Sequence, residues 1–144
     1  MVSNPFIEFK RMNTDAMLPT RGTPGAAGWD LYAYMLDTIG LQPGERKLVS
    51  TGIACAIPSG WVGIIKPRSS MALKGITTDA GVIDEDYRGE VKVMLVNTTE
   101  DYFWIEPGDR VAQMVVLPYL GDAIEVKGLE RSLRMAAGFG STGR

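Results

Sequence analysis

The chain has 144 residues, of which 45% are hydrophobic and 22% charged, and its formal net charge is −2 at pH 7. A chain of this length hides roughly two-thirds of its unfolded surface, and this composition excludes an intrinsically disordered protein. The small excess of acidic residues argues against a surface that coats DNA or RNA.

Short β-rich segments separated by Pro-Gly and Ser-Gly turns dominate the chain. The alternation of apolar and polar residues is clearest over 90–97. In chain order, the pattern predicts strands at 5–12, 29–35, 47–58, 61–66, 90–97, 102–106 and 110–118, and a weaker one at 123–127. A helix of about two turns is expected only at 69–74. Many short strands with turns between them predict an all-β sandwich, jelly roll or barrel.

The two ends of the chain carry no recognisable targeting signal. The N-terminal residues lack an apolar h-region, and the runs 93–96 and 114–117 are too short to span a bilayer. We therefore expect a cytoplasmic protein without a membrane partner; a nuclear or virus-encoded protein stays open.

From Met135 the chain is mostly Ala, Gly, Ser and Thr, which predicts a mobile tail. The expected division is a folded domain at 1–133 and a mobile Gly-rich arm at 134–144.

Histidine is absent, and Cys55 is the only cysteine. Ser-His-Asp and Cys-His nucleophilic machinery is therefore excluded, and so is a zinc site built on histidine. In an enzyme, acid–base chemistry would fall to Asp, Glu, Lys or Tyr, and any metal would be a hard cation held by oxygen, with magnesium as the leading candidate. One cysteine excludes an internal disulfide and fits a reducing compartment. Cys55 lies in an apolar run and is interpreted as inert core.

The segment 81–89, GVIDEDYRG, predicts a hairpin with three acids at its bend. By composition alone, a solvated acidic turn is the commoner outcome. The functional alternative is a carboxylate held at the loop tip, where it orients and deprotonates a water, with Tyr87 against a flat ring such as a sugar face.

Three other polar motifs have a structural and a functional interpretation. The segment 67–70, PRSS, is either an anion site or a plain serine N-cap. Asp30 lies between apolar residues in a predicted strand, so it is either buried with partners or reaches a bound cation. The Gly-rich end at 138–143 matches a dinucleotide-binding pattern but no helix follows it, so we reject that match. A phosphate-wrapping loop helped by Arg134 and a frayed terminus remain the alternatives.

The order of these motifs resembles a known family more closely than any one motif does. AAGWDLYA, PRSS, GVIDEDYRG, GDRVAQ and RMAAGFGSTG, spread over 26–143, resemble the five motifs of the trimeric deoxyuridine triphosphatase (dUTPase) family. The resemblance implies an all-β jelly-roll or distorted β-barrel with one short helix. It implies a homotrimer with active sites shared between subunits and closed by flexible C-terminal arms. It also implies hydrolysis of dUTP to dUMP and pyrophosphate with Mg²⁺, which limits uracil in DNA and supplies dUMP for dTMP synthesis.

The resemblance also assigns roles to individual residues. Asp84 would be the base that orients the attacking water, and Asp30 would place the magnesium ion through water. Tyr87 would pack against deoxyribose and leave no room for a 2′-hydroxyl. Uracil would be read by the backbone of Gly81, Val82 and Ile83 and by the facing strand near Lys92. Phosphates would be held by Arg68, Ser69, Ser70 and Gln113. In the arm, the substrate-binding residues would be Arg134, Ser141 and Thr142 on the γ-phosphate, Phe139 stacked on uracil, and Gly140.

The chain departs from the family pattern at a few positions. Met135 and Ala137 replace two glycines of the last motif, and Trp29 stands where a tyrosine is usual. Asp79 adds a negative charge near the uracil hairpin. Two rival functions stay open: a dCTP deaminase, which shares the fold and the Arg-Ser-Ser element, and a nucleotide-gated protein that binds another macromolecule. No nucleic-acid polymer is expected as a partner, and a further protein partner is left open.

Overall fold

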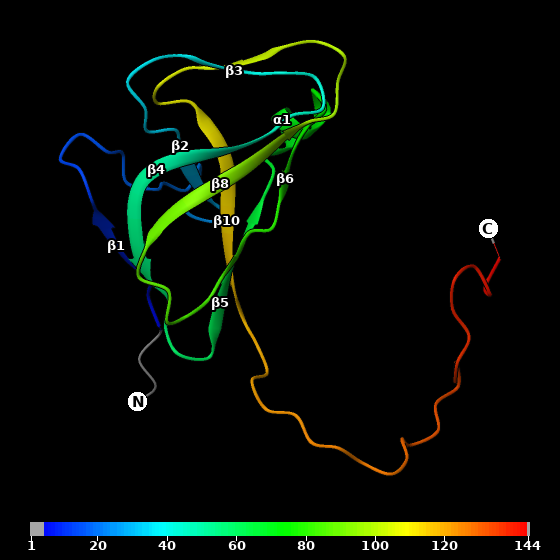
Figure 1. Ribbon diagram of the computed structural model, residues 1–144. Helices are drawn as coiled ribbons and strands as arrows, with labels where there is room; N and C mark the ends of the chain where they lie inside the picture. Colours follow the sequence, from blue (N-terminus) through cyan, green and yellow to red (C-terminus); the bar gives the residue numbers. More distant parts are fainter. Residues whose placement is uncertain (1–4, 144) are drawn as a thin grey trace.

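The computed structural model describes residues 5–143 and confirms an antiparallel, nearly all-β fold (Figure 1). The first sheet has the strand order β1-β4-β8-β6, formed by β1 (Glu8–Arg11), β4 (Arg46–Ala56), β8 (Glu90–Asn97) and β6 (Ile76–Asp79). The second has the order β2-β10-β5-β7, formed by β2 (Trp29–Tyr32), β10 (Arg110–Pro118), β5 (Trp61–Lys66) and β7 (Val82–Ile83). The remaining elements are the ribbon of β3 (Ile39–Leu41) with β9 (Phe103–Ile105) and the helix α1 (Ser69–Leu73).

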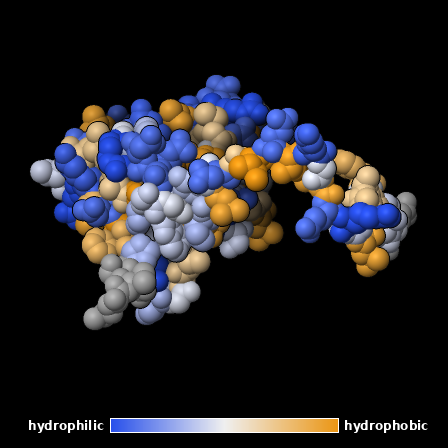
Figure 2. Space-filling view, turned by 90° about the horizontal axis from the view of Figure 1, so that it is seen from below, coloured by the Kyte–Doolittle hydropathy of each residue, from blue (hydrophilic) through white to orange (hydrophobic). Residues whose placement is uncertain are grey.

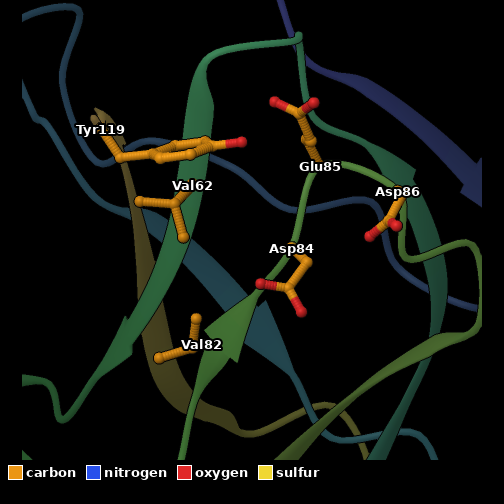
Figure 3. Close-up of a pocket in the computed structure, with 6 residues that line it drawn as sticks. All are labelled: Val62, Val82, Asp84, Glu85, Asp86 and Tyr119. Carbon is orange, nitrogen blue, oxygen red and sulfur yellow. The ribbon is translucent and has the colours of Figure 1, made fainter. Parts of the chain in front are cut away.

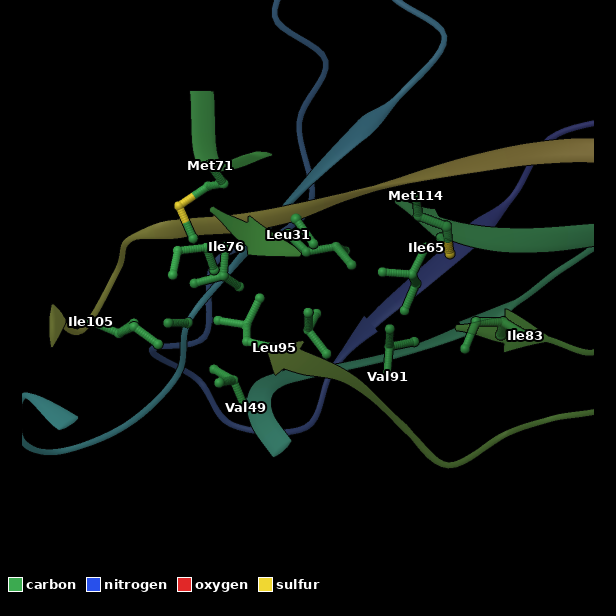
Figure 4. Close-up of a cluster of buried hydrophobic side chains, with 14 of the residues drawn as sticks. Leu31, Val49, Ile65, Met71, Ile76, Ile83, Val91, Leu95, Ile105 and Met114 are labelled. Carbon is green, nitrogen blue, oxygen red and sulfur yellow. The ribbon is translucent and has the colours of Figure 1, made fainter. Parts of the chain in front are cut away.

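The core lies between the two sheets and takes side chains from both (Figure 4). From β8, Val91, Val93 and Leu95 are buried while Lys92 points outward, as the alternation over 90–97 predicts. The second sheet contributes, among others, the buried residues Leu31, Ile65, Ala112 and Met114. Each fully buried aliphatic side chain stabilises the fold by roughly 1.5–3 kcal/mol relative to its exposed state.

An irregularity between β4 and β8 fixes the start of β8. The register passes from Ser50 opposite Lys92 to Ala54 opposite Glu90. Gly52 occupies the bulge with a φ of +68°, a conformation that favours glycine, and its N–H donates to Glu90 Oε1 at 2.9 Å. This contact anchors the strand that follows the acidic hairpin.

The compact part of the described chain ends with β10. Residues 120–143 run away from the body as an extended segment, and the strand predicted at 123–127 is wrong (Figure 1). This segment begins well before residue 134, where the sequence places the start of the arm. Among residues 5–143, no helix is long and apolar enough to span a membrane.

Cys55 is buried in the core, with 3% of its surface exposed. Burial raises the pKa of its thiol, because the charged thiolate is disfavoured away from water. Both observations support its interpretation as a packing residue.

Asn97 is a fully buried polar residue whose side chain is completely used. Its Nδ2 donates to the carbonyl oxygens of Leu41 at 2.9 Å and Asp101 at 2.7 Å. Its Oδ1 accepts from Thr99 N at 3.0 Å and from the Thr99 hydroxyl at 2.8 Å. The side chain therefore links the end of β8 to β3 and to the turn before β9.

We expect Asn97→Ala to lower the free energy of unfolding by about 2–4 kcal/mol, because it leaves buried carbonyl and N–H groups without partners. Urea denaturation at a fixed protein concentration measures this change. The exposed Asn13 provides the control, and Asn13→Ala should change stability by less than about 0.5 kcal/mol. Equal stability of the two variants would contradict the role given to Asn97.

Candidate nucleotide-binding and catalytic site

The hairpin from β7 to β8 encloses a cavity of about 270 Å³. Its lining includes five residues that the sequence assigns to the site, and the full set is Leu48, Val82, Ile83, Asp84, Tyr87, Glu90 and Lys92. Leu48 and Glu90 were missed by the sequence analysis, because their approach depends on the pairing of β4 with β8. We call this cavity the hairpin pocket.

The backbone before β7 takes a sharp turn that only small residues tolerate. Ala80 and Gly81 both have positive φ, 54° and 93°. The Gly81 carbonyl accepts from Ile65 N at 2.8 Å, and a Cβ at position 81 would lie 3.0 Å from Ile65 Cβ. Glycine at position 81 therefore lets β7 lie close against β5.

The acids predicted at the bend occupy a tight turn. Tyr87 N donates to the Asp84 carbonyl at 3.1 Å, which closes the turn 84–87. The Tyr87 hydroxyl donates to the Glu90 carbonyl at 2.7 Å, so its ring spans the neck of the hairpin. A Cβ at Gly89 would lie 2.6 Å from that hydroxyl oxygen. Glycine after Arg88 thus makes room for the Tyr87 ring.

A second, larger cavity lies on the other side of Asp84 (Figure 3). Its volume is about 550 Å³, and it is lined by Val62, Val82, Asp84, Glu85, Asp86 and Tyr119. Val82 and Asp84 line both cavities, so the Asp84 carboxylate lies where they adjoin. Glu85 leaves the turn in a different direction, toward the turn between β4 and β5 (Figure 3).

A polar cluster lies where β2, β10 and β5 run side by side. Gln113 of β10 is paired with Asp30 on one side and with Lys66 on the other. Its Nε2 donates to the Pro67 carbonyl at 3.2 Å. A Cβ at Gly28 would lie 2.1 Å from Gln113 Oε1, so a glycine there preserves the position of this side chain.

The motif 67–70 brings cationic and hydroxyl groups to this cluster. Arg68 is the N-cap residue of α1 and makes no side-chain capping hydrogen bond, so the interpretation of a serine as N-cap is wrong. Ser69 and Ser70 begin the helix with exposed side chains. Their hydroxyls therefore remain open to an anionic ligand, whereas the Arg68 guanidinium also donates to the Arg110 carbonyl at 3.4 Å.

Asp30 is paired with two guanidinium groups. Arg68 Nε lies 3.3 Å from Asp30 Oδ1, Arg110 Nη1 lies 3.7 Å from Oδ2, and the side chain is 14% exposed. This geometry fits the alternative in which Asp30 is buried with partners. Its predicted contact with magnesium stays a prediction.

No group of three or more acidic side chains suited to hold a metal occurs within residues 5–143. Mg²⁺ keeps several of its waters and is often bound through substrate phosphates and only one or two carboxylates. The oxygen-only donors of this region fit an ion that arrives with a triphosphate, and they do not fit a dedicated protein metal centre.

The hairpin pocket and the polar cluster lie beyond opposite ends of β5. Val82 is paired with Ile64, so Asp84 lies near Val62, whereas Lys66 and Arg68 follow the other end of β5. The strand from Val62 to Lys66 spans about 13 Å. Apolar side chains lie between the two ends, and Val82 is 63% exposed.

The arm residues lie apart from both regions. Arg134 Nε donates to the Ala137 carbonyl of its own turn, and Phe139 is fully exposed. Figure 2 shows the segment projecting from the body with hydrophobic residues on its surface. Met135 has a φ of +47°, which is strained for a residue other than glycine. The family pattern that the last motif resembles has glycine at this position. Within one chain, the structure does not bring Arg134, Phe139, Gly140, Ser141 or Thr142 to the hairpin pocket or the polar cluster.

Comparisons with known proteins agree with the motif order. The family model described as dUTPase matches residues 14–143. A deoxyuridine 5′-triphosphate nucleotidohydrolase of Hydrogenobaculum sp. (strain Y04AAS1) is 47% identical over 138 residues, covering 93% of this chain and 95% of the relative. The cowpox virus protein of the same name is 45% identical over 141 residues, covering 97% and 95%.

Solved structures show the same fold. A G164S mutant of the Staphylococcus bacteriophage 80alpha dUTPase, solved with dUpNHpp, superposes with a TM-score of 0.88 at 26% identity, covering 98% of this chain and all of that one. Together with the sequence matches, this places the chain in the dUTPase family, whose enzymes hydrolyse dUTP to dUMP.

Proposed function

We propose that this chain hydrolyses dUTP to dUMP and pyrophosphate by attack of water at the α-phosphorus, with Asp84 as the base that orients and deprotonates that water. The observation that carries this assignment is the position of Asp84 at the tip of a tight turn, where the hairpin pocket meets the larger cavity. A carboxylate fixed in this way acts by alignment, and the reaction needs neither histidine nor a covalent intermediate.

The hairpin pocket would hold the nucleoside. Among the described strands, β7 is the edge strand of its sheet, so one side of its backbone has no strand partner. The backbone groups of Gly81, Val82 and Ile83 that are not used in pairing with β5 would pair with the edge of uracil, with Lys92 on the facing strand. Cytosine presents a different donor pattern at this edge, and the narrow hairpin would exclude a 5-methyl group. The Tyr87 ring would lie against deoxyribose.

The polar cluster would hold the phosphates. Arg68 offers a planar guanidinium, and Ser69, Ser70 and Gln113 offer neutral hydrogen-bond donors. We propose Mg²⁺ as the cofactor, with Asp30 holding it through water. Bound to the triphosphate, the ion would supply charge neutralisation that a chain of net charge −2 lacks. The arm would then close over the nucleotide and exclude bulk water.

We propose that the active sites are shared between copies of the chain in a homotrimer. On one chain, about 13 Å of strand separates the neighbourhood of Asp84 from the polar cluster, whereas the base must reach the water at the α-phosphate within hydrogen-bonding distance. The exposed apolar residues on the same sheet face, including Val82 and Leu117, are also surfaces that a second copy would cover. The number three comes from the family resemblance.

We expect Asp84→Asn to lower kcat for dUTP by about 10²–10⁴-fold with little change in KM, because the amide cannot accept the proton while the binding surfaces are retained. Pyrophosphate release measures turnover. Asp37→Asn, at an exposed turn away from both pockets, is the control and should keep wild-type kinetics. Near-normal turnover of Asp84→Asn would refute the role of base.

Mixing two inactive variants tests whether sites are shared. Asp84→Asn and Arg68→Ala chains are co-expressed and compared with each variant alone. If the two residues act from different chains, randomly mixed trimers should regain about a quarter of the wild-type turnover per site. If one chain supplies both residues, the mixture will stay at the level of the separate variants.

Removal of 134–144 tests the arm. We expect kcat to fall by about 10²-fold or more, because the γ-phosphate contacts and the exclusion of water are lost, while the trimer persists in analytical ultracentrifugation. Met135→Gly, which relieves the strained φ without shortening the chain, serves as the companion variant and should stay active. Dissociation of the truncated protein into monomers would show that the arm has a structural role instead.

A further inference from the structure

Three segments that are far apart in the sequence meet beside Asp84. They are the turn 58–61 between β4 and β5, the acidic turn 84–87, and Tyr119, the first residue after β10. Figure 3 shows the Glu85 side chain reaching the first of these turns, with the Tyr119 hydroxyl directed toward it. Glu85 is partly buried, whereas its neighbours Asp84 and Asp86 are exposed.

Hydrogen bonds join the turn 58–61 both to Glu85 and to the backbone of Tyr119. Gly60 N donates to Glu85 Oε2 at 2.5 Å, and the Ser59 hydroxyl donates to Oε1 at 3.3 Å. The Gly60 carbonyl accepts from Tyr119 N at 3.0 Å. The Tyr119 hydroxyl is directed toward the Glu85 carboxylate (Figure 3).

The protonation behaviour of both groups agrees with this geometry. The hydrogen bond from Gly60 N–H, followed by that from Tyr119, holds the pKa of Glu85 below its ordinary value. The same contact with Glu85 raises the pKa of Tyr119. At neutral pH the Glu85 carboxylate is therefore ionised, so the bond that it accepts from Gly60 N–H is charge-assisted.

We propose that Glu85 is a positioning residue: its carboxylate fixes the turn that carries Asp84, and Tyr119 couples the root of the C-terminal arm to that turn. Within the turn 84–87, a single backbone hydrogen bond, from Tyr87 N to the Asp84 carbonyl, closes the turn. The Arg88 guanidinium also donates to the Glu85 carbonyl at 2.6 Å. Displacement of a catalytic group by about 1 Å costs as much as 10²-fold in rate, so a tether on the adjacent residue matters. The proposal rests on the role proposed for Asp84.

Glu85→Leu and Glu85→Gln separate the acceptor function from side-chain size. We expect Glu85→Leu to lower kcat for dUTP by about 10–100-fold with KM within about threefold, because Glu85 acts on the turn and not on the nucleotide. Glu85→Gln keeps an oxygen that accepts from Gly60 N–H, and it should recover kcat to within about fivefold of wild type. Glu100→Leu, the same replacement at an exposed turn, is the control.

Tyr119→Phe tests the coupling to the arm. It should lower kcat by about three- to tenfold in the wild-type chain and have no further effect in Glu85→Leu, because the hydroxyl acts through Glu85. Additive losses would overturn the coupling. Wild-type kcat in Glu85→Leu, or equal losses in Glu85→Leu and Glu85→Gln, would overturn the positioning role. If Glu85→Leu does not fold, Tyr119→Phe is introduced into the wild-type chain and into the Glu85→Gln chain. Wild-type kcat in both of these proteins would overturn the proposal.

The outcomes for the two proposals are distinguishable. Near-normal turnover of Asp84→Asn would refute the role of Asp84 as the base. Wild-type kcat in Glu85→Leu, together with an inactive Asp84→Asn, would refute the positioning role of Glu85 and leave the role of Asp84 as base unaffected.

Discussion

The position of β5 between β10 and β7 is the constraint on which the rest of the structure depends. On one side, its pairing with β10 aligns Gln113 with Lys66 and leads into the cationic and hydroxyl groups of 67–70. On the other side, its pairing with β7 places Asp84 near Val62. Because an extended strand has a fixed rise per residue, the same strand that positions both halves of the proposed site also keeps them apart on one chain. The proposal that the sites are shared between copies follows from this separation.

Where the sequence predicted the fold correctly, local patterns carried the information. The bounds of β5, β8 and β10 agree with the predicted ranges, because alternation in β8 and β-prone apolar runs in β5 and β10, each set between clear turns, indicate a strand locally. The short strands β3 and β6 were missed, since three or four residues carry too little periodicity to stand out, and β7 was predicted only as the first arm of the hairpin at 81–89. The predicted strand at 123–127 failed for a related reason: its β-prone residues have no neighbouring strand to pair with in the described chain.

In the candidate site, too, local motifs were recognised from the sequence, whereas contacts between distant segments were not. Motif order identified Asp84, Tyr87 and the polar cluster, but it did not identify the contacts that hold them. The pairing of Asp30 with Arg110, like the tether from Glu85 to Gly60, joins residues far apart in sequence. The charge of Asp79, which the sequence left without a partner, is matched by an ion pair with Arg46. Trp29 is accommodated by edge-on packing against Phe9 and by the guanidinium of Arg21 over its ring.

The unpaired edge of β7 has a consequence for how this enzyme tolerates mutation. In the proposed site, uracil would pair with main-chain groups of this edge, so its recognition would not depend on which side chains the strand carries. Single amino-acid replacements would therefore shift the preference between pyrimidines only if they moved the backbone itself. An inhibitor that mimics this pairing would leave few simple routes to resistance, because the positive φ of Gly81 and its close approach to Ile65 restrict which replacements the turn accepts.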